Sequence, residues 1–432
     1  MPQVHNQAIR KYVTPSYTLK QLEELAELLN EKGTLDFKPL ANGLYPAALA
    51  HKEEHSYTGY HNVWVRDNVH VAWGHFVGGD RKAAARCVRA LAEFFWKHQD
   101  RFDSIIDGLA DKNEPMERPH IRFNGDALAE NMETWPHAQN DALGYFLWIF
   151  GKLISCGEVI CSPQDEKLIT LFLEYFHKIE FWQDEDSGHW EEVRKVAASS
   201  IGAVVAGLHA IRPIVETAYH HRNTKLFLPI LDELLLMGRE SLNDILPWEC
   251  KQETQEQQRV DDAALLFLIY PLDVVTHQQA EQIIRNVKEQ LQGEYGIKRY
   301  LGDSYWCDDY KDKLQPEDRT ADVSEDMSAR DSMLTADCEA QWCIFDPILS
   351  IIYGKKYLTS GKTSHLEEQI FYFHRTLGQI TTEDSPMGGF RCPESYYKSH
   401  GVYIPNDITP LYWTQSHLWQ AIVWMKRSMG VT

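Results

Sequence analysis

The strongest constraint on the fold is a helical spacing of apolar residues that recurs along almost the whole chain. In the segment 83–98, apolar residues stand at positions 84, 87, 88, 91, 94 and 95, and the segments 141–154 and 200–211 repeat this spacing. Such a period places the apolar side chains on one face of an α-helix. A chain built this way must pack helix against helix to bury those faces.

About a dozen segments carry the pattern, while convincing alternating strands are absent. The other predicted helices are 18–33, 66–79, 165–179, 226–238, 261–271, 277–292, 339–354, 365–378 and 413–427. No linker rich in Pro, Gly or Ser divides the chain, which favours one domain. We therefore predict an all-α fold, an α/α barrel of paired inner and outer helices with a pocket at one end. An α-solenoid is the alternative, but the fixed repeat that it requires is not found.

Two regions stand apart from this pattern. Residues 1–40 are expected to form an N-terminal extension with one helix, ahead of a barrel at 41–432. Residues 303–337 form a long acidic stretch without periodicity. A long loop inside a compact domain is usually functional or disordered. We expect this one to fold over one end of the helices, where the pocket opens.

Charge and composition narrow the function. The formal net charge is −20, from 63 acidic and 43 basic residues. Such a field repels phosphate backbones and anionic lipid, so nucleic-acid and membrane partners are not expected. A neutral polar substrate is compatible with it. The 13 Trp and 20 Tyr exceed what a helical core needs, and such rings suit a sugar or nucleobase site because they offer an apolar face and a polar edge.

The expected location is the cytoplasm. The N-terminus lacks the apolar core of a secretion signal, and no stretch approaches the roughly 18 uninterrupted apolar residues of a membrane span. The eight cysteines are scattered and form no CxxC pair, as expected for reduced thiols. No loop of oxygen ligands such as DxDxDG occurs, so neither a metal nor a cofactor is predicted.

Four segments mix aromatic and ionisable residues at the ends of predicted helices. They are 60–73, 135–146, 188–195 and 392–397, with 296–306 as a weaker fifth. Their candidate site residues are Trp64, Arg66, Asp67, Trp135, His137, Gln139, Asp141, Trp190, Glu191, Glu192, Arg299 and Glu394. An Arg–Asp pair suits sugar hydroxyls as donor and acceptor. The alternative for Asp67 and Asp141 is that each only caps a helix.

Two of these segments together fit the cleavage of a glycosidic bond. That reaction needs one protonated carboxyl, which delivers a proton to the leaving oxygen, and one ionised carboxylate opposite it. The acid must have a raised pKa, which an apolar wall or a neighbouring anion provides. Trp190 could be that wall for Glu191, with Glu192 as the second negative charge. Across the pocket, Glu394 is followed by Tyr396 and Tyr397, which could shape the opposite face.

At these residues the sequence resembles glycoside hydrolase family 15, the glucoamylases and related α-glucosidases. It is most similar to the glucoamylase-like domain of phosphorylase kinase regulatory subunits. The segments that carry the resemblance are "VWVRDN", "WPHAQNDALGYFL", "WEEV", "RVDDAALLFLIYP", "GIKRYLGDSYW", "CEAQW" and "PLYWTQSHLWQAI", in order between about residues 43 and 428.

The resemblance implies an (α/α)6 barrel and the inverting release of β-glucose from α-glucosidic ends. It implies Glu191 as the general acid and Glu394 as the general base. It also implies that the glucose site is lined by Trp64, Arg66, Asp67, Glu192 and Arg299, with Trp135, His137, Gln139, Asp141 and Trp413 as secondary lining. The pair Glu191–Glu192 is the hydrolase form of the acid loop. Ser395 after the base departs from the hydrolases, which commonly have Gln there, and is nearer to the regulatory subunits.

Three functions follow as hypotheses. The first is an exo-acting α-glucoside hydrolase that acts on a neutral oligosaccharide. The second is a non-catalytic sugar-binding or regulatory module that keeps the barrel and the pocket. The third is another reaction on sugars, such as that of a lyase, an epimerase or a transferase, in which Tyr or His residues rather than Glu191 would control the rate.

Overall fold

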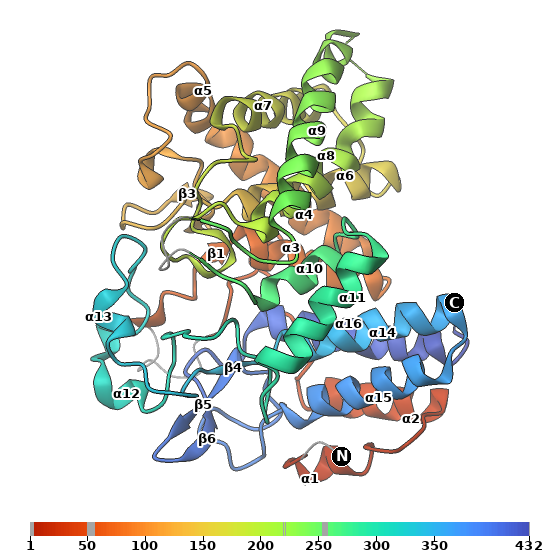
Figure 1. Cartoon of the computed structure of the whole chain (residues 1–432). Coiled ribbons are helices and arrows are strands. Elements are labelled where there is room, and N and C mark those ends of the chain that lie inside the picture. Colours follow the sequence, from red (N-terminus) through yellow and green to blue (C-terminus); the bar gives the residue numbers. More distant parts are fainter. Residues whose placement is uncertain (1–3, 50–56, 219, 221, 253–257, 432) are drawn as a thin grey trace.

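The computed structural model describes residues 4–49, 57–218, 220, 222–252 and 258–431, and helices dominate it (Figure 1). Six helices pack side by side in a closed inner ring, each against the next. They are α3 (Val65–Val77), α6 (Asn140–Ser155), α8 (Ala198–Thr217), α10 (Leu266–Ile269), α14 (Phe345–Ser360) and α16 (Tyr412–Ser428). The predicted α/α barrel is therefore confirmed.

The outer ring covers the inner one, largely with the helix that precedes or follows each inner helix in the chain. It consists of α2 (Leu19–Glu31), α4 (Arg81–Lys97), α7 (Pro163–Ile179), α9 (Leu228–Ile245), α11 (His277–Asn286) and α15 (Thr363–Gly378). A shorter helix, α5 (Gln99–Ile106), packs on α7. The sequence marks several of these helix starts, since Thr18, Ser162 and Thr276 each form a capping box. Each box satisfies backbone amides that the first turn leaves free.

The N-terminal region contains α2 and the one-turn helix α1 (Gln7–Arg10). The apolar face of α2 carries Leu22, Leu25 and Leu29, each fully buried. This helix contacts α16, so it completes the outer ring of the barrel.

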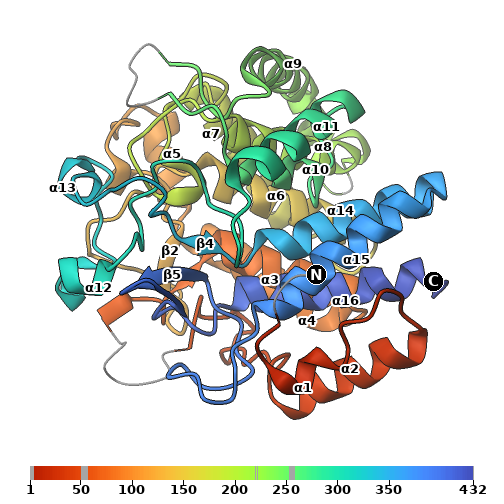
Figure 2. The same cartoon turned by 60° about the horizontal axis from the view of Figure 1, so that its bottom comes forward.

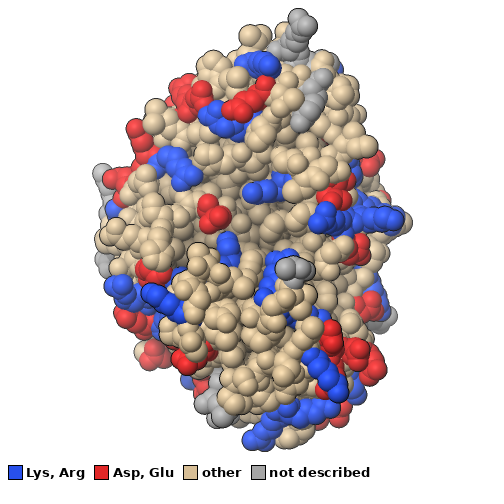
Figure 3. Space-filling view, turned by 90° about the vertical axis from the view of Figure 1, so that its right-hand side faces the viewer, with Lys and Arg blue, Asp and Glu red and all other residues tan. Residues whose placement is uncertain are grey.

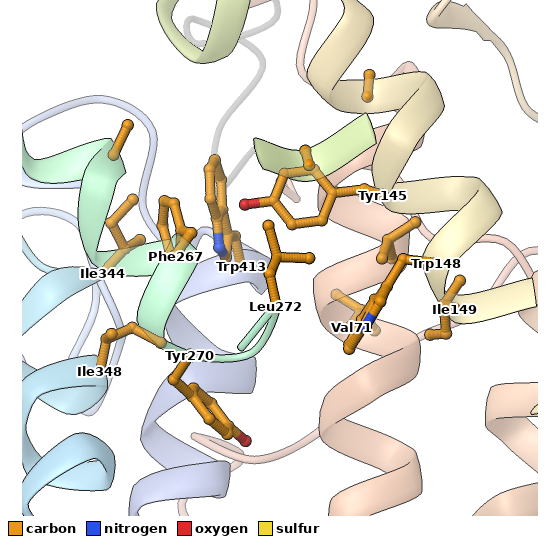
Figure 4. Close-up of a cluster of buried hydrophobic side chains, with 14 of the residues drawn as sticks. Val71, Tyr145, Trp148, Ile149, Phe267, Tyr270, Leu272, Ile344, Ile348 and Trp413 are labelled. Carbon is orange, nitrogen blue, oxygen red and sulfur yellow. The ribbon is translucent and has the colours of Figure 1, made fainter. Parts of the chain in front are cut away.

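The inner helices enclose an aromatic core. Figure 4 shows Trp148 of α6, Phe267 of α10 and Trp413 of α16 converging with aliphatic side chains between the helices. Two inner helices approach especially closely, because a Cβ atom on Gly144 of α6 would lie 2.5 Å from the backbone of Ala203 in α8. Only glycine allows that contact.

Helix α8 is long and apolar enough to cross a membrane by length and composition alone. However, 78% of its apolar window is buried against the rest of the fold. The apolar character of α8 is thus explained by its place in the inner ring.

One predicted helix is much shorter than expected. The segment 261–271 forms a 3₁₀ turn at Ala263–Leu265 followed by α10. The side chain of Asp262 caps the turn through the amide of Ala264, and Tyr270 is already extended, which ends the helix before Pro271. The inner ring is therefore completed at this point by only a short helix.

Two small antiparallel sheets were not predicted. The first has the order β1 (Val63–Trp64), β2 (Arg122–Asn124) and β3 (Ala129–Glu130), and the second β4 (Gln341–Trp342), β5 (Ser395–Ser399) and β6 (Val402–Pro405). Strands of two to five residues are too short for an alternating pattern to appear in the sequence. They matter because they carry or adjoin residues of the pocket.

The acidic stretch 303–337 folds against the molecule and contains the short helices α12 (Tyr310–Lys313) and α13 (Ser328–Asp331). Figures 1 and 2 both place it at the edge of the molecule beside β4 and β5, on the side opposite the free ends of α14 and α15. The loops therefore gather at one end of the barrel, as expected. On the face drawn in Figure 3, basic and acidic side chains are interspersed between broad uncharged areas.

Candidate active site

A cavity opens at the loop end of the barrel and encloses about 750 Å³, including its mouth. Nine of the predicted site residues line it: Trp64, Arg66, Asp67, Trp135, Trp190, Glu191, Arg299, Glu394 and Trp413. Glu191 and Glu394, about two hundred residues apart in the sequence, therefore share one cavity.

Glu191 lies directly after the 3₁₀ turn Gly188–Trp190, in a left-handed conformation with φ of 59°. Such a conformation is unfavourable for a residue with a side chain and is found at functional sites more often than elsewhere. Three donors converge on its Oε1: Trp64 Nε1 at 2.9 Å, Gln139 Nε2 at 3.1 Å and Arg66 at 3.4 Å. Burial raises the pKa of Glu191, although Arg66 opposes that shift. The carboxyl group thus holds a proton more readily than an exposed glutamate, and Oε2 is the oxygen left to carry it.

Glu394 precedes β5 and has donors on both of its oxygens. Tyr60 donates its hydroxyl hydrogen to Oε1 at 2.9 Å, and Asn406 donates from Nδ2 to Oε2 at 2.6 Å. Two such donors stabilise the carboxylate form. Burial acts in the opposite direction and raises the pKa of Glu394 to about 8. Its environment therefore differs from that of Glu191, which accepts all its hydrogen bonds on one oxygen.

Arg66 and Asp67 lie in the first turn of α3, whose N-cap residue is Trp64 without a side-chain cap. Asp67 lines the cavity, and burial raises its pKa to about 7. Arg66 is held from behind by Asp141, whose Oδ2 lies 2.7 Å from the guanidinium. A donor and an acceptor thus stand side by side in the cavity wall, as sugar hydroxyls require.

Three residues of the segment 135–146 lie behind the cavity wall, contrary to expectation. Asp141 is fully buried against Arg66, and Gln139 bridges Arg66 and Glu191. His137 stacks on His120 with ring centroids 3.7 Å apart and accepts a hydrogen bond from the amide of Ile121. These residues position the lining but do not face it.

Glu192 also lies outside the cavity wall, and the expected role as a second negative charge near Glu191 is wrong. Its carboxylate is fully buried and accepts hydrogen bonds from Arg259, Arg299, Arg330 and Tyr300. Burial alone would raise its pKa, but the three arginines lower it to about 2. The charge of Glu192 is therefore neutralised, and burial is what raises the pKa of Glu191.

The aromatic residues that hydrogen-bond to the two glutamates are not the ones expected from the sequence. Trp190 lines the cavity but directs Nε1 to Asp262 at 3.0 Å, and the indole that donates a hydrogen bond to Glu191 is that of Trp64. Neither Tyr396 nor Tyr397 is in the cavity wall. Tyr396 donates to the carbonyl of Gln379.

Sequence reasoning missed several residues of the lining. These are Tyr60, Pro136, His189, Tyr305, residues 320–323, Arg330, Trp342 and Leu411. Tyr60 and Tyr305 belong to segments already singled out as rich in aromatic and ionisable residues, so that mixture was the available signal. Residues 320–323 and Arg330 come from the acidic stretch, where no local pattern indicates which side chains face inward.

One group among the described residues has the spacing of metal ligands. The ligating atoms of Asp309, Asp312 and His400 all lie within 4.8 Å of one another. Asp312 and His400 are exposed, and none of the three lines the cavity. This group therefore lies apart from the cavity.

The hydroxyl of Tyr60 gives a direct test of the environment of Glu394. In Tyr60→Phe, loss of a donor to the carboxylate removes roughly 1.5–3 kcal/mol of stabilisation from its ionised form. We expect the pKa of Glu394 to rise and any rate that needs its ionised form to fall about ten-fold at neutral pH. A titration of Glu394 followed by NMR measures the shift.

The control is Tyr396→Phe, which also removes a buried tyrosine hydroxyl but one bound to the carbonyl of Gln379. It is expected to lower the melting temperature slightly and to leave the titration of Glu394 unchanged. Equal titration curves for Tyr60→Phe and the native chain would show that the hydroxyl does not stabilise the carboxylate.

Comparison with known proteins decides the family. The sequence model of Glycosyl hydrolases family 15 matches residues 25–337. The chain belongs to this family. A probable phosphorylase b kinase regulatory subunit alpha from Caenorhabditis elegans is 24% identical over an alignment of 406 positions, which covers 82% of this chain and 30% of that protein. The chain thus spans less than a third of that relative.

Solved structures of a glycosidase and of a glucoamylase share the fold. A glycosidase in complex with glucose superposes with a TM-score of 0.64 at 17% identity, covering 95% of this chain and 98% of the other. A glucoamylase from Saccharomycopsis fibuligera gives a TM-score of 0.61 at 12% identity, covering 97% and 98%. Likeness at this identity establishes the (α/α)6 barrel.

Proposed function

We propose that this chain is an inverting, exo-acting α-glucoside hydrolase with Glu191 as the general acid and Glu394 as the general base. The observation that carries the proposal is the presence of both carboxyl groups in one cavity with different hydrogen-bond partners. Family membership and the bound glucose of a similar glycosidase support a sugar as the substrate.

In this mechanism, Glu191 transfers the proton on Oε2 to the glycosidic oxygen as the bond from that oxygen to the anomeric carbon breaks. Glu394 accepts a proton from a water molecule as the water oxygen bonds to the anomeric carbon from the opposite face. The products are β-glucose and the rest of the glucoside, which leaves with a hydroxyl group at the former glycosidic oxygen. The glutamates exchange protonation states and return to the start by proton exchange with solvent.

Binding of the terminal glucose is assigned to the inner end of the cavity. Arg66 and Asp67 offer a donor and an acceptor to its hydroxyl groups, and both are almost completely buried. Trp64 and Trp413 provide apolar ring faces, and the Arg66 guanidinium lies 5.8 Å from the centre of the Trp413 ring. Buried polar groups that pair with sugar hydroxyls give strong discrimination against ligands lacking them.

The experiment that tests the proposal is the release of glucose from maltose, isomaltose, trehalose and maltotriose by the purified protein. Turnover of at least one of them is expected, and it should depend on Glu191. Absence of turnover on all four, with measurable binding, would contradict the proposal.

That result would favour a second candidate, a non-catalytic sugar-binding or regulatory module. The similarity to the phosphorylase b kinase regulatory subunit over 82% of this chain is the observation that favours it. Ser395, at which the sequence departs from the hydrolases toward the regulatory subunits, follows the proposed base and is buried in β5 opposite Trp342.

The pH optimum of kcat/KM is expected to lie above the pH at which exposed glutamates titrate. Catalysis needs Glu394 ionised and Glu191 protonated, so the rate falls below the pKa of the first and above the pKa of the second. Burial raises the pKa of both groups, to about 8 for Glu394, whereas an exposed glutamate titrates near about 4.3. We predict a bell-shaped profile displaced to higher pH than that of two exposed glutamates, with little activity at pH 4–5, where Glu394 is protonated. A maximum at pH 4–5 would contradict the assignment of these shifts.

A further inference from the structure

We propose that a segment of the acidic stretch, residues 319–331, limits the substrate to glucosides about the size of a disaccharide. We call this segment the cavity loop. The inference rests on the proposed function for the orientation of the substrate. It concerns the length of the sugar and not the chemistry of the bond.

The cavity loop is fixed near Glu394 at its first end. The guanidinium of Arg319 lies 3.8 Å from Asp407 Oδ2, and Lys311, in the helix just before the loop, lies 2.9 Å from Oδ1 of the same carboxylate. Tyr57 donates its hydroxyl hydrogen to Asp407 at 2.7 Å. Asp407 follows Asn406, the donor to Glu394. This end of the loop is thus bound to Asp407, the neighbour in sequence of the residue that donates a hydrogen bond to the proposed base.

The other end of the cavity loop is fixed near Glu191. Arg330 donates to Glu192 Oε1 at 3.3 Å and to the hydroxyl of Ser304 at 2.9 Å. The same hydroxyl donates to Asp331 at 2.6 Å. Glu192 adjoins the proposed acid and is fully buried. The loop therefore runs from the base side of the cavity to the acid side.

Between these two ends, residues 320–323 form part of the cavity wall. Most of them are partly exposed, whereas Arg66 and Asp67 on the inner helix α3 are buried. Figures 1 and 2 place α12, which precedes the cavity loop, and α13, which ends it, at the edge of the molecule. The loop thus lies at the outer part of the cavity.

This arrangement has a consequence for substrate length. If the terminal glucose contacts Arg66 and Asp67, the leaving sugar occupies the outer part, between aromatic residues such as Trp135 and Tyr305 and the cavity loop. Each additional sugar unit extends the ligand further outward, toward a wall that is fixed at both ends. Moving that wall requires breaking the ion pairs of Arg319 and Arg330, one of which engages a fully buried carboxylate. Separating one partner from a buried ion pair is costly, because the other charge is left uncompensated inside the protein.

The test compares ligands of two and six sugar units in two linkage series, maltose with maltohexaose and isomaltose with isomaltohexaose. Affinity is measured by titration calorimetry on Glu191→Gln, and kcat/KM on the native protein. We expect the six-unit sugar to bind at least about ten-fold more weakly than the two-unit sugar in the preferred series. Equal or tighter binding of the six-unit sugar would overturn the inference.

Two variants then ask whether the cavity loop is the cause. Lys311→Ala combined with Arg319→Ala releases the end near Asp407, and neither side chain is in the cavity wall. Asp322→Gly combined with Val323→Gly removes two wall side chains directly. Each is expected to raise the ratio of six-unit to two-unit affinity about ten-fold, and the first should leave disaccharide turnover unchanged.

The matched control is Glu317→Gln, an exposed charge change just before the same loop, which should leave the ratio unaltered. An unchanged ratio in both loop variants would overturn the inference, even with an active enzyme. Conversely, if no glucoside is hydrolysed but the binding ratio responds as stated, the proposed function fails and the length limit stands.

Discussion

Glu191→Gln is expected to lower kcat for a natural α-glucoside by about 10²–10⁴-fold, the usual contribution of a positioned general acid. Glutamine has the shape of glutamic acid and keeps the contacts of Oε1 with Trp64, Gln139 and Arg66. It has no proton to transfer to the leaving oxygen. The measurement is single-turnover glucose release, which reports the chemical step itself.

The chemical role is tested by changing the leaving group. Fluoride leaves from α-glucosyl fluoride without being protonated, so Glu191→Gln should hydrolyse this compound at close to the native rate. Glu133→Gln is the control, because it makes the same change at an exposed position two residues before the cavity residue Trp135 in the chain. A variant equally slow on the fluoride and on the glucoside would show that Glu191 positions the sugar and does not donate a proton.

Glu394→Gln is expected to lower kcat by a similar factor, about 10²–10⁴-fold, but on both kinds of substrate. The reason is that the attacking water must lose a proton whatever the leaving group is. The exchange also places an amide nitrogen where the carboxylate accepts from Tyr60 or Asn406, so one donor loses its acceptor. Rates on the glucoside and on the fluoride, measured side by side with Glu191→Gln, distinguish the two glutamates.

A nucleophile that needs no deprotonation should partly replace the base. Azide is expected to restore turnover of α-glucosyl fluoride by Glu394→Gln and to give the β-glucosyl azide. Glu383→Gln, an exposed glutamate in the same part of the chain with 70% side-chain exposure, should behave like the native protein. Native rates for Glu394→Gln would remove Glu394 from the mechanism.

The helices of this fold follow from the sequence because their information is local. The three-to-four residue spacing of buried side chains in α4 is visible in any short window, and the continuous apolar character of α6 and α8 matches their burial on nearly all sides. The caps at Thr276 and Thr18 are equally local. The helix predicted over 261–271 was too long, because the apolar pattern does not show the cap by Asp262 or the extended conformation of Tyr270.

The site was only partly predictable because its contacts are distant in sequence. The aromatic and ionisable residues around Glu191 and Glu394 stood out in short segments, and both lie in the cavity wall. The arginines that neutralise Glu192 come from three separate regions, at Arg259, Arg299 and Arg330. Likewise, one of the two donors to Glu394 is Tyr60, 334 positions away. No local pattern encodes such pairs, so the actual environment of each carboxylate required the folded chain.

The most direct test of the two-glutamate mechanism is the configuration of the first glucose released, observed by proton NMR before mutarotation. Direct attack of a water activated by Glu394, on the face opposite to the group protonated by Glu191, predicts β-glucose from an α-glucoside. Initial release of α-glucose would contradict it, because retention requires a second displacement that this pair of roles does not provide.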